Sequence, residues 1–427
     1  MTKKRLFGCI TAILVLISMF SGCTNKNIAE KFEVPQYEDD KTITIGAWTS
    51  GWIFDLQGTM KPEYWEMYEN AYMNMCIATP PNDGIEQLDE AWEHGVSVLV
   101  NERNWDGTIP DYLDHPAFLG FCVYDEPTYS TFGKLAAQKK EWLSSDMADK
   151  WFFVNVFPSY AAAEHLGENY DTYIKDWIDC MNPEVLSMDH YAIVQNGETK
   201  SIRTTWFSDM DVCAHYASEA GIPFWYSLLS AGHMGIYDTA SVEEMRWQMA
   251  VGQAYGAQGL IHFLFAPQGE DYTAMIDHEL TNTTELYDDV VIANAEVAKW
   301  DHIYMNFTWQ GTDTILGTLN KFSPAFELCK YRVDATLQSC ITEITSDEDL
   351  LCGMFKDGDD NQGFMLVNAT NPADGYDAAV SVTFEKEYTG ALIIERGEQR
   401  VVALDGNTLD IVIPSSDGIF VIPLVAK

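Results

Sequence analysis

The chain has 427 residues, of which 47% are hydrophobic and 13% aromatic, so it is long enough for two globular domains. Its 25 Lys and Arg residues are outnumbered by 65 Asp and Glu residues, which gives a net charge of −40. That charge repels phosphates, so it argues against nucleic acid as a partner and favours a neutral or cationic ligand.

The N-terminus has the form of a bacterial export signal. A basic cluster, Lys3–Arg5, precedes an apolar run, Leu6–Phe20, that is too short to span a bilayer comfortably. The following Ser-Gly-Cys sequence resembles the end of a lipobox with Cys23 as the lipidated residue. We therefore predict a signal peptide over 1–23, a polar tether over 24–40 and a lipid anchor on the outer side of a bacterial membrane. A plain cleaved signal peptide is the alternative.

Between residues 41 and 306 one unit recurs: a short apolar strand, a polar or aromatic loop and an amphipathic helix. The predicted strands are Ile43–Trp48, Met73–Thr79, Val96–Asn101, Phe118–Tyr124, Trp151–Phe157, Val185–Asp189, Pro223–Leu228 and Gly259–Phe265. The predicted helices include Ile85–His94, Thr131–Ser144, Tyr170–Met181, Ser208–Ala220, Val242–Tyr255 and Thr283–Met305. Strands separated by helices pair in parallel, and eight such units match a (β/α)8 TIM barrel.

A doubly wound open sheet is the competing fold for this region. The first predicted strand is followed by Trp48–Trp52 and not by the Gly-rich turn of a dinucleotide site, so we expect no nucleotide cofactor. From 307 to 427 the pattern changes to short strands separated by turns, which predicts an antiparallel β-sandwich domain. Its predicted strands are Leu350–Phe355, Gly363–Val367, Ala379–Phe384, Gly390–Ile394, Thr408–Val412 and Ile419–Leu424.

The fourth predicted barrel strand stops at two carboxylates, Asp125 and Glu126, followed by Pro127. Glycoside hydrolysis uses two carboxyl groups, one that protonates the leaving oxygen and one that attacks the sugar or activates water. Glu126 is the candidate acid, because desolvation and the neighbouring Asp125 would raise its pKa. A strand-end turn with a helix cap beyond it is the structural alternative.

The candidate second carboxylate is Asp189, which ends the sixth predicted strand. A structural carboxylate that holds His190 or Arg203 is the alternative. Glu102 is a weaker candidate. Asp125 is another, but adjacent residues of an extended strand point to opposite faces of a sheet.

Polar and aromatic side chains gather where the predicted strands end, as a sugar site requires. The candidate substrate-binding residues are Trp48, Trp52, Glu102, Trp105, Tyr124, Asp125, Asn155, His190, Tyr191, Trp225 and His233. We expect at most two of the four tryptophans to face the cleft. Two histidines near the rim, His190 and His233, are too few for a zinc site, so we expect no metal.

These residues resemble the retaining clan of (β/α)8 glycoside hydrolases that carry Asn-Glu-Pro at the end of strand four, with the glutamate as acid/base. In this chain Glu126 and Pro127 match that motif, and Asp125 replaces the asparagine. The order of signal, barrel and sandwich is also similar to that of glycosidase-like surface lipoproteins of gut bacteria. The resemblance implies a cell-surface glycoside hydrolase acting on a neutral oligo- or polysaccharide.

One feature departs from that clan, which places its nucleophilic glutamate at the end of strand seven. The corresponding segment here, Tyr226–His233, contains no carboxylate. A non-catalytic carbohydrate-binding lipoprotein on a barrel scaffold is therefore the alternative function.

Overall fold

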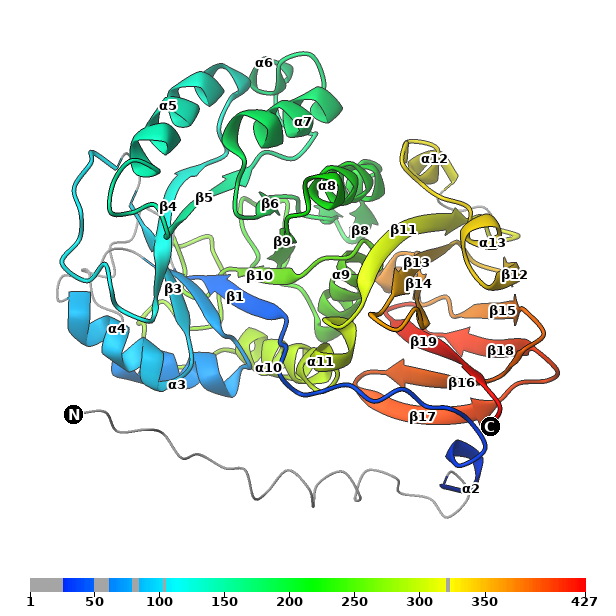
Figure 1. Cartoon of the computed structure of the whole chain (residues 1–427). Coiled ribbons are helices and arrows are strands. Elements are labelled where there is room, and N and C mark those ends of the chain that lie inside the picture. The colour runs from blue at the N-terminus through cyan, green and yellow to red at the C-terminus, as the bar shows by residue number, and fades with distance from the viewer. Residues whose placement is uncertain (1–25, 50–60, 79–83, 103–104, 320–322) are drawn as a thin grey trace.

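Eight parallel strands form a closed barrel in the computed structural model, which describes residues 26–49, 61–78, 84–102, 105–319 and 323–427 (Figure 1). The order around the barrel is β1-β10-β9-β6-β5-β4-β3-β2, and each neighbouring pair is parallel. The strands are β1 Thr44–Trp48, β2 Met75–Ala78, β3 Ser97–Asn101, β4 Phe118–Asp125, β5 Trp151–Val156, β6 Leu186–Met188, β9 Phe224–Leu229 and β10 Gly259–Phe263. All eight predicted strands are present, and the TIM barrel prediction is confirmed.

Helices surround the barrel and cover its outer face (Figure 1). The longer ones are α3 Pro62–Asn70, α4 Gly84–Glu93, α5 Phe132–Trp142, α7 Tyr170–Met181, α8 Trp206–Ala220, α9 Val242–Ala254 and α10 Glu285–Ala298. The shorter ones are α2 Lys26–Ala29, α6 Ala163–Leu166, α11 Asp301–Tyr304, α12 Ser323–Phe326 and α13 Ala335–Gln338. The described part of the β3–β4 connection contains no helix.

The strands are apolar on both faces because the barrel encloses its own core inside the ring of helices. The inner cluster contains Met75, Leu99, Phe153 and Trp225. Gly259 leaves room for an inner side chain, since a Cβ there would lie 2.2 Å from the Trp225 ring.

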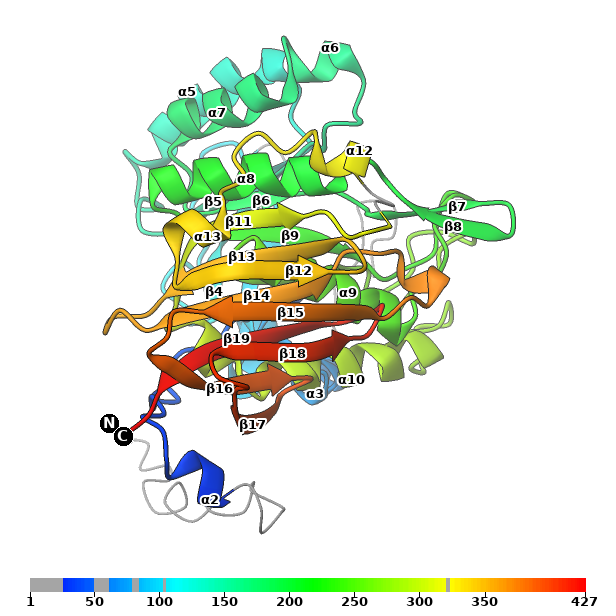
Figure 2. The same ribbon diagram turned by 90° about the vertical axis from the view of Figure 1, so that its right-hand side faces the viewer.

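An antiparallel hairpin, β7 Ile193–Asn196 and β8 Thr199–Ile202, is inserted between β6 and α8 and projects from the barrel (Figure 2). The sequence analysis did not predict it, although Asn196-Gly197 is a strong hairpin signal and Gly197 has a φ of 66°.

The C-terminal region is an antiparallel β-sandwich, as predicted. A six-stranded sheet has the order β11-β13-β14-β19-β16-β17, and a three-stranded sheet has the order β12-β15-β18 (Figure 2). The strands are β11 Thr308–Ile315, β12 Ile341–Ser346, β13 Leu350–Lys356, β14 Gln362–Asn368, β15 Ala378–Phe384, β16 Tyr388–Glu395, β17 Glu398–Ala403, β18 Thr408–Ile413 and β19 Gly418–Val425. The unpredicted strands are β11 and β12, whose sequences are mostly polar, and β17, which is half polar.

The six-stranded sheet packs against α9 of the barrel. Trp247 of that helix donates from Nε1 to the carbonyl oxygen of Asn368, at 3.0 Å. The backbones approach so closely that a Cβ on Gly353 would lie 2.2 Å from the carbonyl oxygen of Ala254.

The described N-terminal segment is attached to the sandwich at the edge where the chain ends. Phe32 is buried and forms a bridge with Ala426, and Lys31 accepts a backbone hydrogen bond from Lys427 at 2.9 Å. The later part of the predicted tether is thus fixed to the sheet, while residues 1–25 lie outside the described part of the chain. Within the described ranges no helix has the length and apolar character needed to cross a bilayer.

Candidate active site

A bulge in β4 decides which acidic side chain enters the barrel. The register with β5 shifts between Cys122 and Tyr124, so that Val123 and Tyr124 both pack on the helix side of the sheet. Asp125 then aligns with Asn155, whose buried side chain faces inward. Regular alternation along this strand would have pointed the Asp125 side chain away from the barrel interior. For that reason the sequence analysis counted alternation against Asp125 as the second carboxylate.

Polar side chains follow the apolar inner layer on several strands. The Ser187 hydroxyl on β6 donates to Asn155 Oδ1 on β5 at 2.9 Å. Further inward positions hold Asn101 on β3 and Ser227 on β9, which align with Cys122 and Ile261 of the inner cluster. The sequence analysis did not propose Asn101, Ser187 or Ser227, although each lies two residues beyond an inward apolar residue.

Among these inward side chains, Asn101 Oδ1 and Asn155 Nδ2 are buried without a hydrogen-bond partner in the described residues. Ser227 and Asp189 lie close enough for their side chains to act on each other. Buried polar atoms are nearly always paired, with protein or with a bound molecule. Such a cluster at one end of a barrel therefore suits a polar ligand or ordered water.

Asp189 is the carboxyl group that this environment perturbs most clearly. Burial and the negative charge of Asp125 raise its pKa from 3.8 to about 7, while the side chains of Tyr191 and Ser227 act in the opposite direction. Like charges that lie close together disfavour simultaneous ionisation. The two carboxyl groups thus form an electrostatic pair contributed by β4 and β6.

Glu126 lies just beyond the end of β4 in a left-handed backbone conformation, with a φ of 51°. Its N–H donates to the carbonyl oxygen of Asn155 at 2.8 Å. The pKa of Tyr191 is raised by burial and by the charges of Asp189, Asp125 and Glu126. All three carboxylates therefore act at the same rim, and Tyr191 lies within reach of each.

A set of aromatic rings adjoins Asp189, and we call it the aromatic wall. It consists of Tyr160, Tyr191, His233, Tyr237, Phe263 and Tyr272. The centre of the His233 ring lies 5.2 Å from that of Tyr191, and the His233 ring stacks on Tyr272 with the ring centres 5.4 Å apart. Burial lowers the pKa of His233, and its Nδ1 donates to the carbonyl oxygen of Ala231 at 2.8 Å, so Nε2 is the acceptor nitrogen.

His190 does not share this site. Its ring is fully buried outside the barrel wall, between Tyr160 and Trp206, with Nδ1 at 2.8 Å from Oδ2 of Asp209. Asp209, and not Asp189, is the carboxylate that holds it. The expectation that His190 contacts substrate is therefore wrong: it follows Asp189 directly and points to the opposite face.

The predicted aromatic platforms are mostly core residues. Trp225 packs on Trp151 at 5.2 Å inside the barrel, and Trp48 belongs to the same inner cluster. Trp105 packs edge-on against Trp142 at 4.9 Å in the outer core. These three side chains are at most 7% exposed, so none offers a ring face to a sugar.

Two more candidates lie away from the inward polar side chains, and a third lies outside the described part of the chain. Tyr124 packs on the helix side because of the bulge. Glu102 follows β3, where burial and Asp106 raise its pKa, and its own charge acts on Tyr112. Trp52 lies outside the described residues.

The seventh barrel strand, β9, carries no carboxylate. Its inward side chains include Trp225 and Ser227, and it ends at Leu229. The predicted strand count is correct, so the departure from the Asn-Glu-Pro clan is real, and the paired carboxyl groups come from β4 and β6. Among the described residues, no group of three or more His, Cys, Asp or Glu side chains is arranged to hold a metal ion.

Comparison with known proteins places the fold among those of glycoside hydrolases. A structure named glycoside hydrolase is 9% identical, covers 92% of this chain and 95% of its own, and has a TM-score of 0.52. A Bacteroides fragilis protein proposed to be an α-galactosidase is 7% identical, with 90% and 79% coverage and a TM-score of 0.49. The family 30 xylanase Xyn30A from Clostridium acetobutylicum is 9% identical, with 90% and 97% coverage and a TM-score of 0.34.

No protein-family model and no curated protein matches the sequence. At these identities the likeness is one of fold, and the chain has the barrel-and-sandwich architecture of a glycoside hydrolase structure.

Proposed function

We propose that the chain is a glycoside hydrolase in which Asp125 and Asp189 perform the chemistry. The observation that carries the proposal is that the bulge in β4 turns Asp125 into the mouth of the barrel, where it acts on the buried Asp189 carboxyl group and raises its pKa. Pairs of carboxyl groups whose environments separate their pKa values are typical of acid/base assignments in glycosidases.

The roles follow from the raised pKa of Asp189. Asp189 retains a proton near neutral pH and protonates the glycosidic oxygen. Asp125, as its ionised partner, attacks the anomeric carbon or activates a water molecule. This assignment gives Asp189 the acid role first assigned to Glu126, and gives Asp125 the role of nucleophile or base first assigned to Asp189. Glu126, beside Tyr191, is then positioned to bind a sugar hydroxyl.

The substrate class that fits is a neutral oligo- or polysaccharide. The rim has three carboxylates and the chain a net charge of −40, so an acidic sugar would be repelled. Tyr160, Phe263 and Tyr272 are the members of the aromatic wall that are not fully buried, and they supply apolar faces. The inward polar side chains of the barrel supply hydrogen-bonding groups for hydroxyls.

The test compares Asp125→Asn, Glu126→Gln and Asp189→Asn on a panel of aryl glycosides and natural glycans, with released sugars as the readout. We expect both aspartate variants to lose about 10³-fold or more on natural glycans. Asp189→Asn should retain more activity on aryl glycosides with good leaving groups, because these need little acid assistance. Glu126→Gln should remain within about tenfold of the wild type.

Loss of activity in Glu126→Gln with a fully active Asp125→Asn would return the acid role to Glu126. Saturable glycan binding without any released product would instead favour the alternative function, a carbohydrate-binding protein. Circular dichroism of each variant separates these outcomes from unfolding.

We also propose that the protein is exported and lipid-anchored at Cys23. The sequence pattern supports this, as does the attachment of the segment from Lys26 onward to the sandwich, which would keep that domain near the membrane. Labelling cells with a fatty-acid analogue should mark the wild type and not Cys23→Ala. An unlabelled wild type would favour a plain cleaved signal.

A further inference from the structure

Arg203 joins three tyrosines of the site. Its Nε donates to the carbonyl oxygen of Tyr191 at 3.1 Å, and its Nη2 donates to the Tyr237 hydroxyl at 2.7 Å. The guanidinium carbon lies 3.9 Å from the centre of the Tyr160 ring. An arginine is suited to this task because its planar fork donates in fixed directions while its face stacks on an aromatic ring.

Tyr191 connects this arginine to the carboxylates. Its backbone N–H donates to the Tyr160 hydroxyl at 3.4 Å, so both polar groups of its backbone are held by the same set of side chains. Its own ring is buried beside Asp189, with Asp125 and Glu126 in electrostatic reach. A change at Arg203 therefore reaches Asp189 through one intervening residue.

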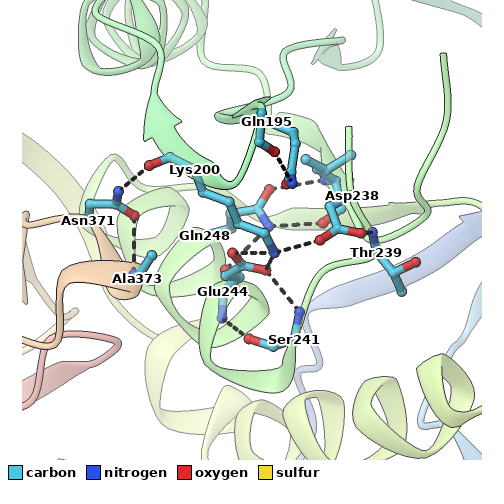
Figure 3. A network of polar contacts seen from close by, with 11 residues as sticks. Gln195, Lys200, Asp238, Thr239, Ser241, Glu244, Gln248, Asn371 and Ala373 are labelled. Carbon is cyan, nitrogen blue, oxygen red and sulfur yellow. Dashed lines mark hydrogen bonds and ion pairs between the residues drawn. The ribbon is translucent and has the colours of Figure 1, made fainter. Parts of the chain in front are cut away.

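Arg203 is itself held in place by the β7–β8 hairpin that precedes it. Lys200 of β8 forms ion pairs with Glu244 at 2.9 Å and Asp238 at 3.3 Å (Figure 3). The carbonyl oxygen of Lys200 accepts a hydrogen bond from Asn371 of the sandwich at 2.9 Å. The hairpin is thus fixed both to the start of α9 and to the second domain.

We propose that Arg203 is a positioning residue, which holds Tyr191 against the Asp189 carboxyl group without contacting the reacting atoms. The inference rests on the proposed function of Asp189. It gives the inserted hairpin a role in the reaction: to deliver a cation that orders the tyrosines around the acid.

The expected effect has a definite sign. The groups that face Asp189 are Asp125 from β4, Ser227 from β9, Tyr160 from the loop after β5, and Tyr191. Of these, Tyr191 and Ser227 lower the pKa of Asp189, whereas burial and Asp125 raise it. Releasing Tyr191 should therefore raise the pKa of Asp189 further and move the alkaline limb of the pH–rate profile to higher pH.

The experiment follows the titration of Asp189 by NMR of protein with 13C-labelled aspartate, with Asp189→Asn for assignment. Arg203→Met and Tyr191→Phe should each shift the titration upward, and the double variant should shift it no further than Tyr191→Phe alone. Arg203→Lys keeps the positive charge but loses the planar guanidinium group, so it should give an intermediate shift. It replaces Arg203→Met in the test if that variant does not fold.

The matched control is Arg246→Met. Arg246 makes a two-pronged contact with Glu296, at 2.7 Å for both bonds, away from the barrel mouth. This variant should lower the Tm and leave the Asp189 titration unchanged. An Arg203→Met protein with a lower Tm and an unchanged Asp189 titration would overturn the proposal. A double variant whose shift in the Asp189 titration equals the sum of the two single shifts would also overturn it.

The titration can be read whether or not a glycoside is cleaved, so it separates this inference from the proposed function. If a substrate is found, Arg203→Met should lower kcat about 10- to 100-fold and change KM by less than about threefold.

Discussion

Asp189 and His190 are neighbours in the chain, yet they serve different parts of the molecule. The Asp189 carboxyl faces the barrel mouth and Asp125, while the His190 ring is buried against Asp209 behind the wall. The sequence predicted both as site residues because both follow the sixth strand. The two side chains point to opposite faces just beyond the end of β6, and contacts with Asp209 and Trp206 hold the His190 ring on the outer face.

The raised pKa of Asp189 predicts a pH-dependent stability. The pKa of an aspartate in an unfolded chain is about 3.8, and burial and the charge of Asp125 raise the pKa of Asp189 to about 7 in the folded chain. Between these values the folded protein keeps a proton that the unfolded chain releases, so the stability contributed by this group falls as the pH rises from about 4 to 7. Asp189→Asn should remove that loss. Its free energy of unfolding should exceed that of the wild type by on the order of 1 kcal/mol or more at pH 8, and the two should differ little at pH 4.

Thermal unfolding of the wild type and Asp189→Asn from pH 4 to 8 measures this difference. A gap in Tm that stays constant over that range would contradict the assignment of a raised pKa to this carboxyl group.

At the scale of elements, β4 is the strand that sets the site. Its bulge at Val123 reverses the inward and outward positions beyond it, so Asp125 enters the barrel. A second irregularity, in the register with β3, lies near Gly120. There β4 and β5 come so close that a Cβ on Gly120 would lie 2.2 Å from the carbonyl oxygen of Trp151.

Gly120→Ala should therefore push β4 from β5, destabilise the fold by about 1–3 kcal/mol and reduce activity with it. Gly133→Ala is the matched control, because Gly133 lies in α5 and nothing apart from its own helix lies within 4 Å of its added Cβ. The control should be neutral or stabilising by up to about 1 kcal/mol. Denaturant unfolding measures both, and equal effects would contradict the close approach at β4.

At the scale of the whole molecule, barrel and sandwich share an interface that runs along α9. Two side chains of β11 reach this helix, since Trp309 and Thr312 both donate to the carbonyl oxygen of Ala254, at 3.1 and 2.7 Å. In the other direction, Trp247 of the helix donates to the carbonyl oxygen of Asn368. The same helix carries Gln248, which bonds both backbone groups of Leu229 at the end of β9. The sandwich thus supports the helix that braces one strand of the site.

A chain that ends after residue 306 should not fold stably, because it would expose the apolar side of α9 with Trp247. We expect it to aggregate or to bind a hydrophobic dye, and we expect the full chain to unfold in one transition. Differential scanning calorimetry tests both statements. Two separate transitions, or a soluble barrel with its own Tm, would show that the domains are independent.

The sequence by itself determined the eight barrel strands, the sandwich and the rim as the place where acids gather. Strand and helix periodicity, and the polar residues that follow each apolar strand, are local signals that need no partner to be read. It did not determine which acid faces inward, because one extra residue in β4 changes the alternation and no local signal marks it. The tertiary structure also decided that three tryptophans are core and that Arg203 reaches the site, since burial and contacts between distant loops depend on how the whole chain packs.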